Sequence, residues 1–142
     1  SFILPNQAER LSALERKLSV IEASVTKKRV VVVDDSLVRG NTARTIVKLL
    51  REGGAKEVWL RVASPPIAWP CDLGIDMATQ EELLYRRADP DQAQPQHDDA
   101  ALERVRRFID ADSLRYLSLA GLRRSVSHKS LCFGCMTGSY PT

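Results

Sequence analysis

The sequence has little of what marks a membrane protein or a nucleic-acid-binding protein. No apolar run among the 142 residues is long enough to span a bilayer, and the first ten residues show no basic region followed by an apolar one. The net charge is only +3, and the basic residues are scattered rather than gathered into a block. We therefore expect neither a membrane nor a nucleic acid as a partner.

Cysteine is also scarce, since the chain has three: Cys71, Cys132 and Cys135. An odd and low count argues against a disulfide framework and favours a reducing cytoplasm. Cys132 and Cys135 form a CxxC pair, which alone is compatible with zinc, redox chemistry, a cluster or no function. A zinc site would need more Cys or His, and His128 is the only local candidate. Three packed free thiols remain an open alternative.

The first half of the chain carries an alternation of strand and helix patterns. The β-branched run Val30–Val33 predicts a strand buried on both faces. Ala43–Glu52 has helical spacing and is followed by Gly53-Gly54, a common helix end. Glu57–Ala63 predicts the next strand. Strand, helix and strand at this spacing indicate a βαβ unit and hence a parallel sheet.

The remaining segments predict helices and loops, and no strand is assigned after Ala63. The segment 67–76 is expected to be irregular, and the polar, proline-containing stretch 88–99 to be a flexible surface loop. Thr79 and Glu82 have capping-box spacing before a short helix. Further helices are predicted at Pro5–Ile21, Ala101–Ile109 and Ser118–Val126.

The stretch VVVVDDSLVRGNT, residues 30–42, is the strongest functional signal. Ligands of parallel sheets bind outside the carboxyl ends of strands, where Asp34 and Asp35 are placed. The following loop leads into a helix N-terminus, which offers backbone N–H groups to an anion. Carboxylates for sugar hydroxyls or a hydrated metal, followed by phosphate donors, suit a phosphorylated ribose. The candidate binding residues are Asp34, Asp35, Ser36, Leu37, Val38, Arg39, Gly40, Asn41 and Thr42.

The same stretch resembles the phosphoribosyl pyrophosphate (PRPP) motif of type I phosphoribosyltransferases. Together with REGGAKEV, SPPIAWPCDLGIDM, ADSLRYLSLAGL and CFGCMTGSYPT, it is similar to the amidophosphoribosyltransferases. The resemblance covers nearly the whole chain except residues 88–99. One departure is Asn41, where the family usually has threonine.

The resemblance implies a partial type I phosphoribosyltransferase fold of the α/β class. This is a parallel sheet flanked by helices, with an irregular and helical C-terminal tail. We expect residues 1–87 to form the later half of the transferase domain, 88–99 a loop, and 100–142 a helical segment with the CxxC pair. The glutaminase domain of the family is expected to lie upstream and is absent from this sequence.

The resemblance also implies a function. Residues 34–42 would bind PRPP, with Mg²⁺ at Asp34 and Asp35, and glutamine-derived ammonia would displace pyrophosphate to give 5-phosphoribosylamine. The sequence by itself would then be inactive, and the full-length enzyme a homo-oligomer. Two alternatives stay open: a PRPP-binding regulatory protein, and a metal-binding or cluster-binding structural module with a vestigial PRPP loop.

One branch of the family carries a [4Fe–4S] cluster, and Cys71, Cys132 and Cys135 match the pattern of that branch. Such a cluster needs four thiolates. The resemblance therefore implies a fourth ligand outside this chain.

Overall fold

The computed structural model describes residues 18–74, 79–88, 99–127 and 130–141. Its elements along the chain are α2 (Glu22–Val25), β1 (Arg29–Asp34), α3 (Asn41–Glu52), β2 (Glu57–Val62), the 3₁₀ turn η1 (Gln80–Glu82), α4 (Leu84–Ala88), α5 (Asp99–Ile109), β3 (Ser113–Tyr116), α6 (Leu119–Ser125) and α7 (Gly134–Thr137).

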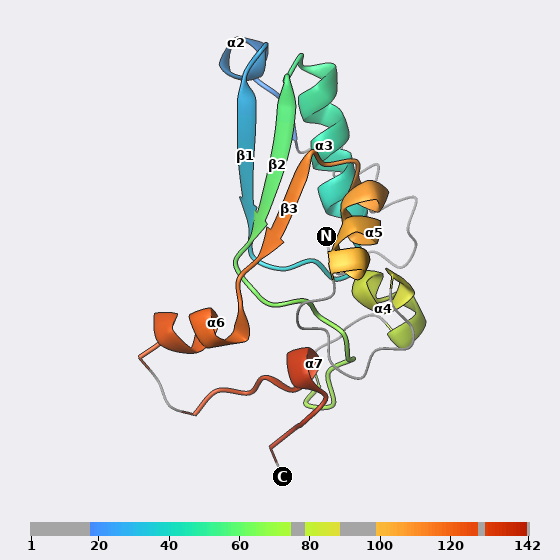
Figure 1. The fold of residues 1–142 in the computed structure, drawn as a ribbon, viewed down its shortest axis with the longest axis vertical. Helices are drawn as coiled ribbons and strands as arrows, with labels where there is room; N and C mark the ends of the chain where they lie inside the picture. Colours follow the sequence, from blue (N-terminus) through green and yellow to red (C-terminus); the bar gives the residue numbers. More distant parts are fainter. Residues whose placement is uncertain (1–17, 75–78, 89–98, 128–129, 142) are drawn as a thin grey trace.

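Three parallel strands in the order β1-β2-β3 form the sheet (Figure 1). Val30 pairs with Val58, and Leu60 pairs with both Val32 and Leu114. The predicted βαβ unit, β1-α3-β2, is confirmed, and β3 continues the parallel sheet beyond it. The strand carboxyl ends therefore meet at one edge, from which the loop at 35–40 departs.

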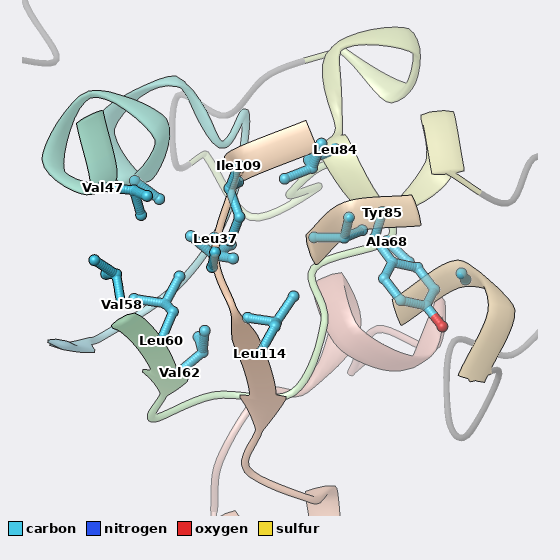
Figure 2. Packing of buried hydrophobic residues seen from close by; sticks show 14 residues of the cluster. Leu37, Val47, Val58, Leu60, Val62, Ala68, Leu84, Tyr85, Ile109 and Leu114 are labelled. Carbon is cyan, nitrogen blue, oxygen red and sulfur yellow. The ribbon is translucent and has the colours of Figure 1, made fainter. Parts of the chain in front are cut away.

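One face of the sheet is covered by helices α3 and α5, with α4 packed against α5, and the main hydrophobic core lies between these helices and the strands. Alternate residues of β2 and β3 point into this core, because successive side chains of a strand face opposite sides. Figure 2 shows Val58, Leu60, Val62 and Leu114 turned towards residues such as Val47 and Ile109 on the helices, all of them buried.

The other face of the sheet is open in the described part of the chain. The prediction that Val30–Val33 is buried on both faces is wrong here, because Val31 is 52% exposed and Val33 is 74% exposed. The physical reason is position: β1 is an edge strand of the described sheet, and the described helices cover one face. A run of valines signals a strand, but it does not say what covers each face.

Several helix predictions are confirmed with shifted ends. The helix after the loop begins at Asn41 rather than Ala43, and Gly53 and Gly54 follow its end as predicted. Ser118 caps α6 as predicted, since its Oγ accepts a hydrogen bond from Gly121 N. The predicted helix after Thr79 is split into η1 and α4.

Two predictions reach beyond the described residues. Most of the helix predicted at Pro5–Ile21 lies outside them, and its last residues, 18–21, are not helical, because the backbone of Ile21 is extended before α2. The loop predicted at 88–99 also lies mostly outside them. No helix in the described part of the chain is long and apolar enough to cross a bilayer.

Strand β3, Ser113–Tyr116, was not predicted from the sequence. The segment has only four residues and one buried leucine, Leu114, so its own pattern is too short to be distinctive. Its strand structure depends on pairing with Trp59–Val62. The C-terminal part of the chain thus contributes to the sheet as well as forming helices.

Candidate functional site

The loop after β1 places two carboxylates side by side. Asp34 ends the strand on its covered side and is half-buried, whereas Asp35 is exposed. The Asp35 N–H donates to Asp34 Oδ1 at 3.0 Å, and Ser36 Oγ donates to Asp35 Oδ1 at 2.9 Å. Burial raises the pKa of Asp34, the Asp35 N–H lowers it, and the Asp35 charge raises it further. A cation at this position would favour the ionised form of both groups.

The turn into α3 depends on Gly40. This residue has a left-handed backbone with φ 79°, and its carbonyl accepts from Arg44 N at 3.0 Å to begin the helix. A Cβ at this position would collide with Leu84 Cδ2 and lie 3.3 Å from Phe108 Cε1. Glycine is therefore required for both the conformation and the close packing. The tight turn brings the loop directly to the N-terminus of α3, where free N–H groups and the helix dipole favour an anion.

Contacts with the segment 82–84 hold the loop. Leu84 N donates to the carbonyl of Val38 at 2.8 Å. Arg39 Nη2 forms an ion pair with Glu82 Oε2 at 3.1 Å. Leu37 is buried in the core. The loop is thus held by one buried apolar side chain, one backbone hydrogen bond and one ion pair.

This arrangement fits the chemistry of a magnesium-bound phosphoribosyl ligand. Mg²⁺ prefers oxygen ligands and is usually held by one or two carboxylates together with substrate phosphates. Asp34 and Asp35 supply adjacent carboxylates, Ser36 carries a hydroxyl in the loop, and Thr42 carries one in the first turn of α3. The nine predicted residues run without a break from the end of β1 (34) through the loop (35–40) into the first turn of α3 (41–42).

The cysteines lie on two segments that meet near the loop, since Val38 and Cys135 pack against the same small apolar cluster. Ala68 N and Trp69 N donate to the carbonyl of Cys135 at 2.9 Å and 3.1 Å. Tyr140 OH donates to the carbonyl of Pro70. Cys132 lies just before α7 and accepts from Gly134 N at 3.4 Å. The segment around Cys71 and the C-terminal tail are therefore held together by backbone contacts.

The three thiols are near enough to affect one another. The pKa of Cys135 is raised, first by burial and then by Cys71 and Cys132. Burial, with charges that include the same cysteines, raises the pKa of Tyr140 to about 12. Across the described ranges, however, no three His, Cys, Asp or Glu side chains form a group that could hold a metal ion. The predicted cysteines are brought to one corner of the molecule without forming a closed ligand set.

Comparison with known proteins agrees with the resemblance. No protein-family model matches the chain. Amidophosphoribosyltransferases of Methanocaldococcus jannaschii and Bacillus subtilis are 46% and 43% identical over 100% of the chain. The solved glutamine PRPP amidotransferase of B. subtilis, complexed with ADP and GMP, superposes on 98% of the chain with a TM-score of 0.71 and 42% identity.

Over its whole length the chain is thus similar to one part of the amidophosphoribosyltransferases. It spans 28% and 29% of the length of the M. jannaschii and B. subtilis relatives, and 29% of the solved B. subtilis chain. A second solved structure, described as the allosteric regulatory enzyme of purine biosynthesis, matches with a TM-score of 0.70 at 40% identity and over the same 29% of its length. The α/β fold with a parallel sheet is thus shared with this family.

Two contacts that matter for the site were missed from the sequence. Glu82 was recognised as the third residue of a capping box, but its ion pair with Arg39 was not. The contact of Tyr140 with Pro70, which joins the tail to the Cys71 segment, was also missed. Both join residues far apart in the chain, for which a single sequence carries no periodic signal. For the Arg39 contact, the sequence offered only a partial signal, namely two neighbouring glutamates after Thr79.

Proposed function

We propose that this chain carries the PRPP-binding loop of an amidophosphoribosyltransferase. In the proposed reaction, ammonia displaces pyrophosphate from ribose C1 of PRPP and gives 5-phosphoribosylamine. The ammonia would come from glutamine through a part of the enzyme outside these 142 residues. The complete enzyme is proposed to act in the cytoplasm as a homo-oligomer.

The observation that carries this proposal is the continuous turn from β1 into α3. Asp34 and Asp35 stand at the carboxyl end of the strand, and Gly40 brings the chain immediately to a helix N-terminus. Sugar hydroxyls or a cation can therefore meet carboxylates while a phosphate meets N–H donors a few residues later. The similarity to amidophosphoribosyltransferases over the whole chain supports the same assignment.

The residues of the loop would act by binding and orientation. Asp34 and Asp35 would hold the ribose hydroxyls and Mg²⁺, and residues 36–42 would surround the 5-phosphate. The metal would neutralise charge on the pyrophosphate that leaves. Carboxylates fixed near the ring would also stabilise positive charge that develops on the sugar. Neither aspartate is required to transfer a proton.

The test is calorimetric titration of the full-length protein with PRPP in the presence of Mg²⁺. Asp34→Ala with Asp35→Ala is expected to weaken binding at least ten-fold, because both carboxylate ligands are lost. A matched control is Glu22→Ala with Glu52→Ala, which removes two exposed acidic groups outside the loop. Unchanged PRPP affinity in the Asp34 and Asp35 variant would refute the assignment. PRPP binding without formation of phosphoribosylamine would favour a regulatory protein instead.

We also propose that Cys71, Cys132 and Cys135 ligate a [4Fe–4S] cluster, with a fourth ligand from outside the chain. The support is that backbone contacts of Cys135 with Ala68 and Trp69 bring the segment around Cys71 beside the C-terminal tail. Three thiols are a donor set typical of a cluster or zinc. A positively charged metal would favour the thiolate forms that their mutual proximity otherwise disfavours. The group would be structural, joining the 68–71 segment to the tail.

Purification of the full-length protein without oxygen tests this second proposal. The protein is expected to be brown and to contain iron and labile sulfide in equal amounts, and Cys135→Ser should lose both. Cys132→Ser is the matched variant at the exposed thiol of the same pair. A colourless, iron-free or zinc-containing protein would refute the cluster. The PRPP assignment would stand, because it depends on different residues.

A further inference from the structure

The η1 turn reaches the proposed PRPP loop through one carboxylate. Glu82 Oε2 accepts from Thr79 N at 3.3 Å, which ties it to the start of its own turn. The same oxygen pairs with Arg39 Nη2 at 3.1 Å. Glu82 therefore connects a local helix cap with a residue 43 positions earlier in the chain.

Arg39 depends on this contact for its placement. Its side chain is 29% exposed, and its Nε is buried without a hydrogen-bond partner among the described residues. Burial without a partner disfavours the observed position of Nε, so another interaction must hold the guanidinium there. The ion pair with Glu82 is the charged contact that the structure gives it.

The backbone on both sides of Arg39 is restrained by the next residues of the same segment. Leu84 N donates to the carbonyl of Val38 at 2.8 Å, and Leu84 packs so closely on Gly40 that a Cβ would not fit. The side-chain contact of Glu82 and the backbone contact of Leu84 thus act on three consecutive loop residues. Because an exposed ion pair adds little stability, the contact between Glu82 and Arg39 matters mainly for the position of the guanidinium.

We propose that Glu82 is a positioning residue for PRPP binding, which acts through Arg39 by holding the loop in its binding conformation. This inference rests on the proposed function of residues 34–42. Glu82 itself touches no ligand in this proposal. Its carboxylate neutralises Arg39 and fixes the direction of the guanidinium, while the loop N–H groups remain free for phosphate.

The proposal is tested by calorimetric titration of the full-length protein with PRPP and Mg²⁺. Glu82→Ala should raise the Kd for PRPP about three- to ten-fold, the range for a partly exposed charged contact. Glu82→Gln keeps an oxygen that can accept from Thr79 N and Arg39, so it should recover at least half of the lost affinity on a logarithmic scale. A purely structural role would show itself as a lower melting temperature without this recovery.

A double-mutant cycle shows whether Glu82 acts through Arg39. Arg39→Ala and the double variant Arg39→Ala with Glu82→Ala should bind PRPP with the same Kd, because the second change has nothing left to position. Additive losses would overturn the proposal, and so would an unchanged or lower Kd in Glu82→Ala.

The matched control is Glu57→Ala. It removes the partner of Arg29, whose Nε lies 2.7 Å from Glu57 Oε2, at the end of β1 opposite the loop. Its Kd for PRPP should stay within two-fold of the unmodified protein, and a rise equal to that of Glu82→Ala would overturn the proposal. Failure of the unmodified protein to bind PRPP would overturn the proposed function as well, whereas normal binding with no effect of Glu82→Ala refutes the positioning role alone.

Discussion

The two faces of the sheet differ sharply in how far their side chains are buried. On the covered face, Leu60 is 1% exposed beneath the helices. On the open face of the neighbouring strand, Val33 is 74% exposed. The open face also carries Trp59, with the Arg29 and Arg61 guanidinium groups 4.5 Å and 5.2 Å from its ring centre. Arginine stems shield part of that surface, but Val31 and Val33 of β1 stay largely exposed.

Within the described residues, one face of the sheet is buried by helices and the other face is not. The covered face supports the proposed PRPP loop, because the core that buries Leu37 is the one that anchors the turn into α3. On the open face, the edge strand β1 presents the exposed side chains of Val31 and Val33. An exposed apolar edge strand favours association with another surface. The relatives are more than three times as long as this chain, which covers 28% of one of them. We therefore expect the open face to be covered in a full-length protein.

The largest effect is expected on the covered face. Leu60→Ala should lower the free energy of unfolding by about 3 kcal/mol, because it removes a buried side chain and leaves a cavity. The comparison is Val33→Ala on the open face, which should cost less than about 1 kcal/mol in the 142-residue chain. Urea unfolding at low protein concentration measures both. Equal losses would show that the two faces are equally buried.

Gly40 provides the second test, because it packs against Leu84 and Phe108 of the helices on the covered face. Gly40→Ala should destabilise by about 2 kcal/mol, which combines the left-handed conformation with a clash against Leu84. Gly74→Ala is the matched control, because Gly74 has φ 89° but no atom within 4 Å of the added Cβ. It should cost about 1 kcal/mol. If the control costs as much as Gly40→Ala, packing against α4 is unimportant.

The open face itself is tested by Val31→Thr with Val33→Thr. In the 142-residue chain the change should alter stability by less than about 1 kcal/mol, because both side chains are already exposed. Sedimentation should show that the unmodified chain self-associates and that the double variant does so less. In the full-length protein the same change should cost more, about 2 kcal/mol or above, if that face is covered there. Similar costs in both proteins would contradict the comparison.

The covered face and the loop were largely predictable, whereas the open face and the tertiary contacts were not. Val30–Val33 and the glycines after Glu52 define β1-α3-β2 through local patterns. The paired aspartates and Gly40 located the candidate site for the same reason. The exposure of Val31 and Val33 depends on which strands are neighbours, and β3 depends on pairing with β2. The contact of Glu82 with Arg39 depends on where η1 packs, and no local pattern records this.

The smallest effect is expected at the solvent side of α5, whose inner side carries Val105 and Ile109 in the core. Glu103 accepts from Arg106 Nε at 2.6 Å and from Arg107 Nε at 2.8 Å. These contacts lower the pKa of Glu103 from 4.5 to about 2. Because folding lowers this pKa, the stabilisation is fully present above pH 4.5 and is lost as pH falls through about 2.

Glu103→Gln should therefore lower the melting temperature slightly at pH 7 and have no effect well below pH 2. The control is Glu52→Gln, whose carboxylate lies 3.8 Å from Lys48 Nζ on the exposed side of α3, and it should have a smaller effect at pH 7. Salt should reduce the difference between Glu103→Gln and the unmodified chain, because both partners face solvent. A difference that persists below pH 2 would mean that Glu103 contributes through packing rather than through its charge. In that case the outer side of α5 would contribute to stability in the same way as its covered side.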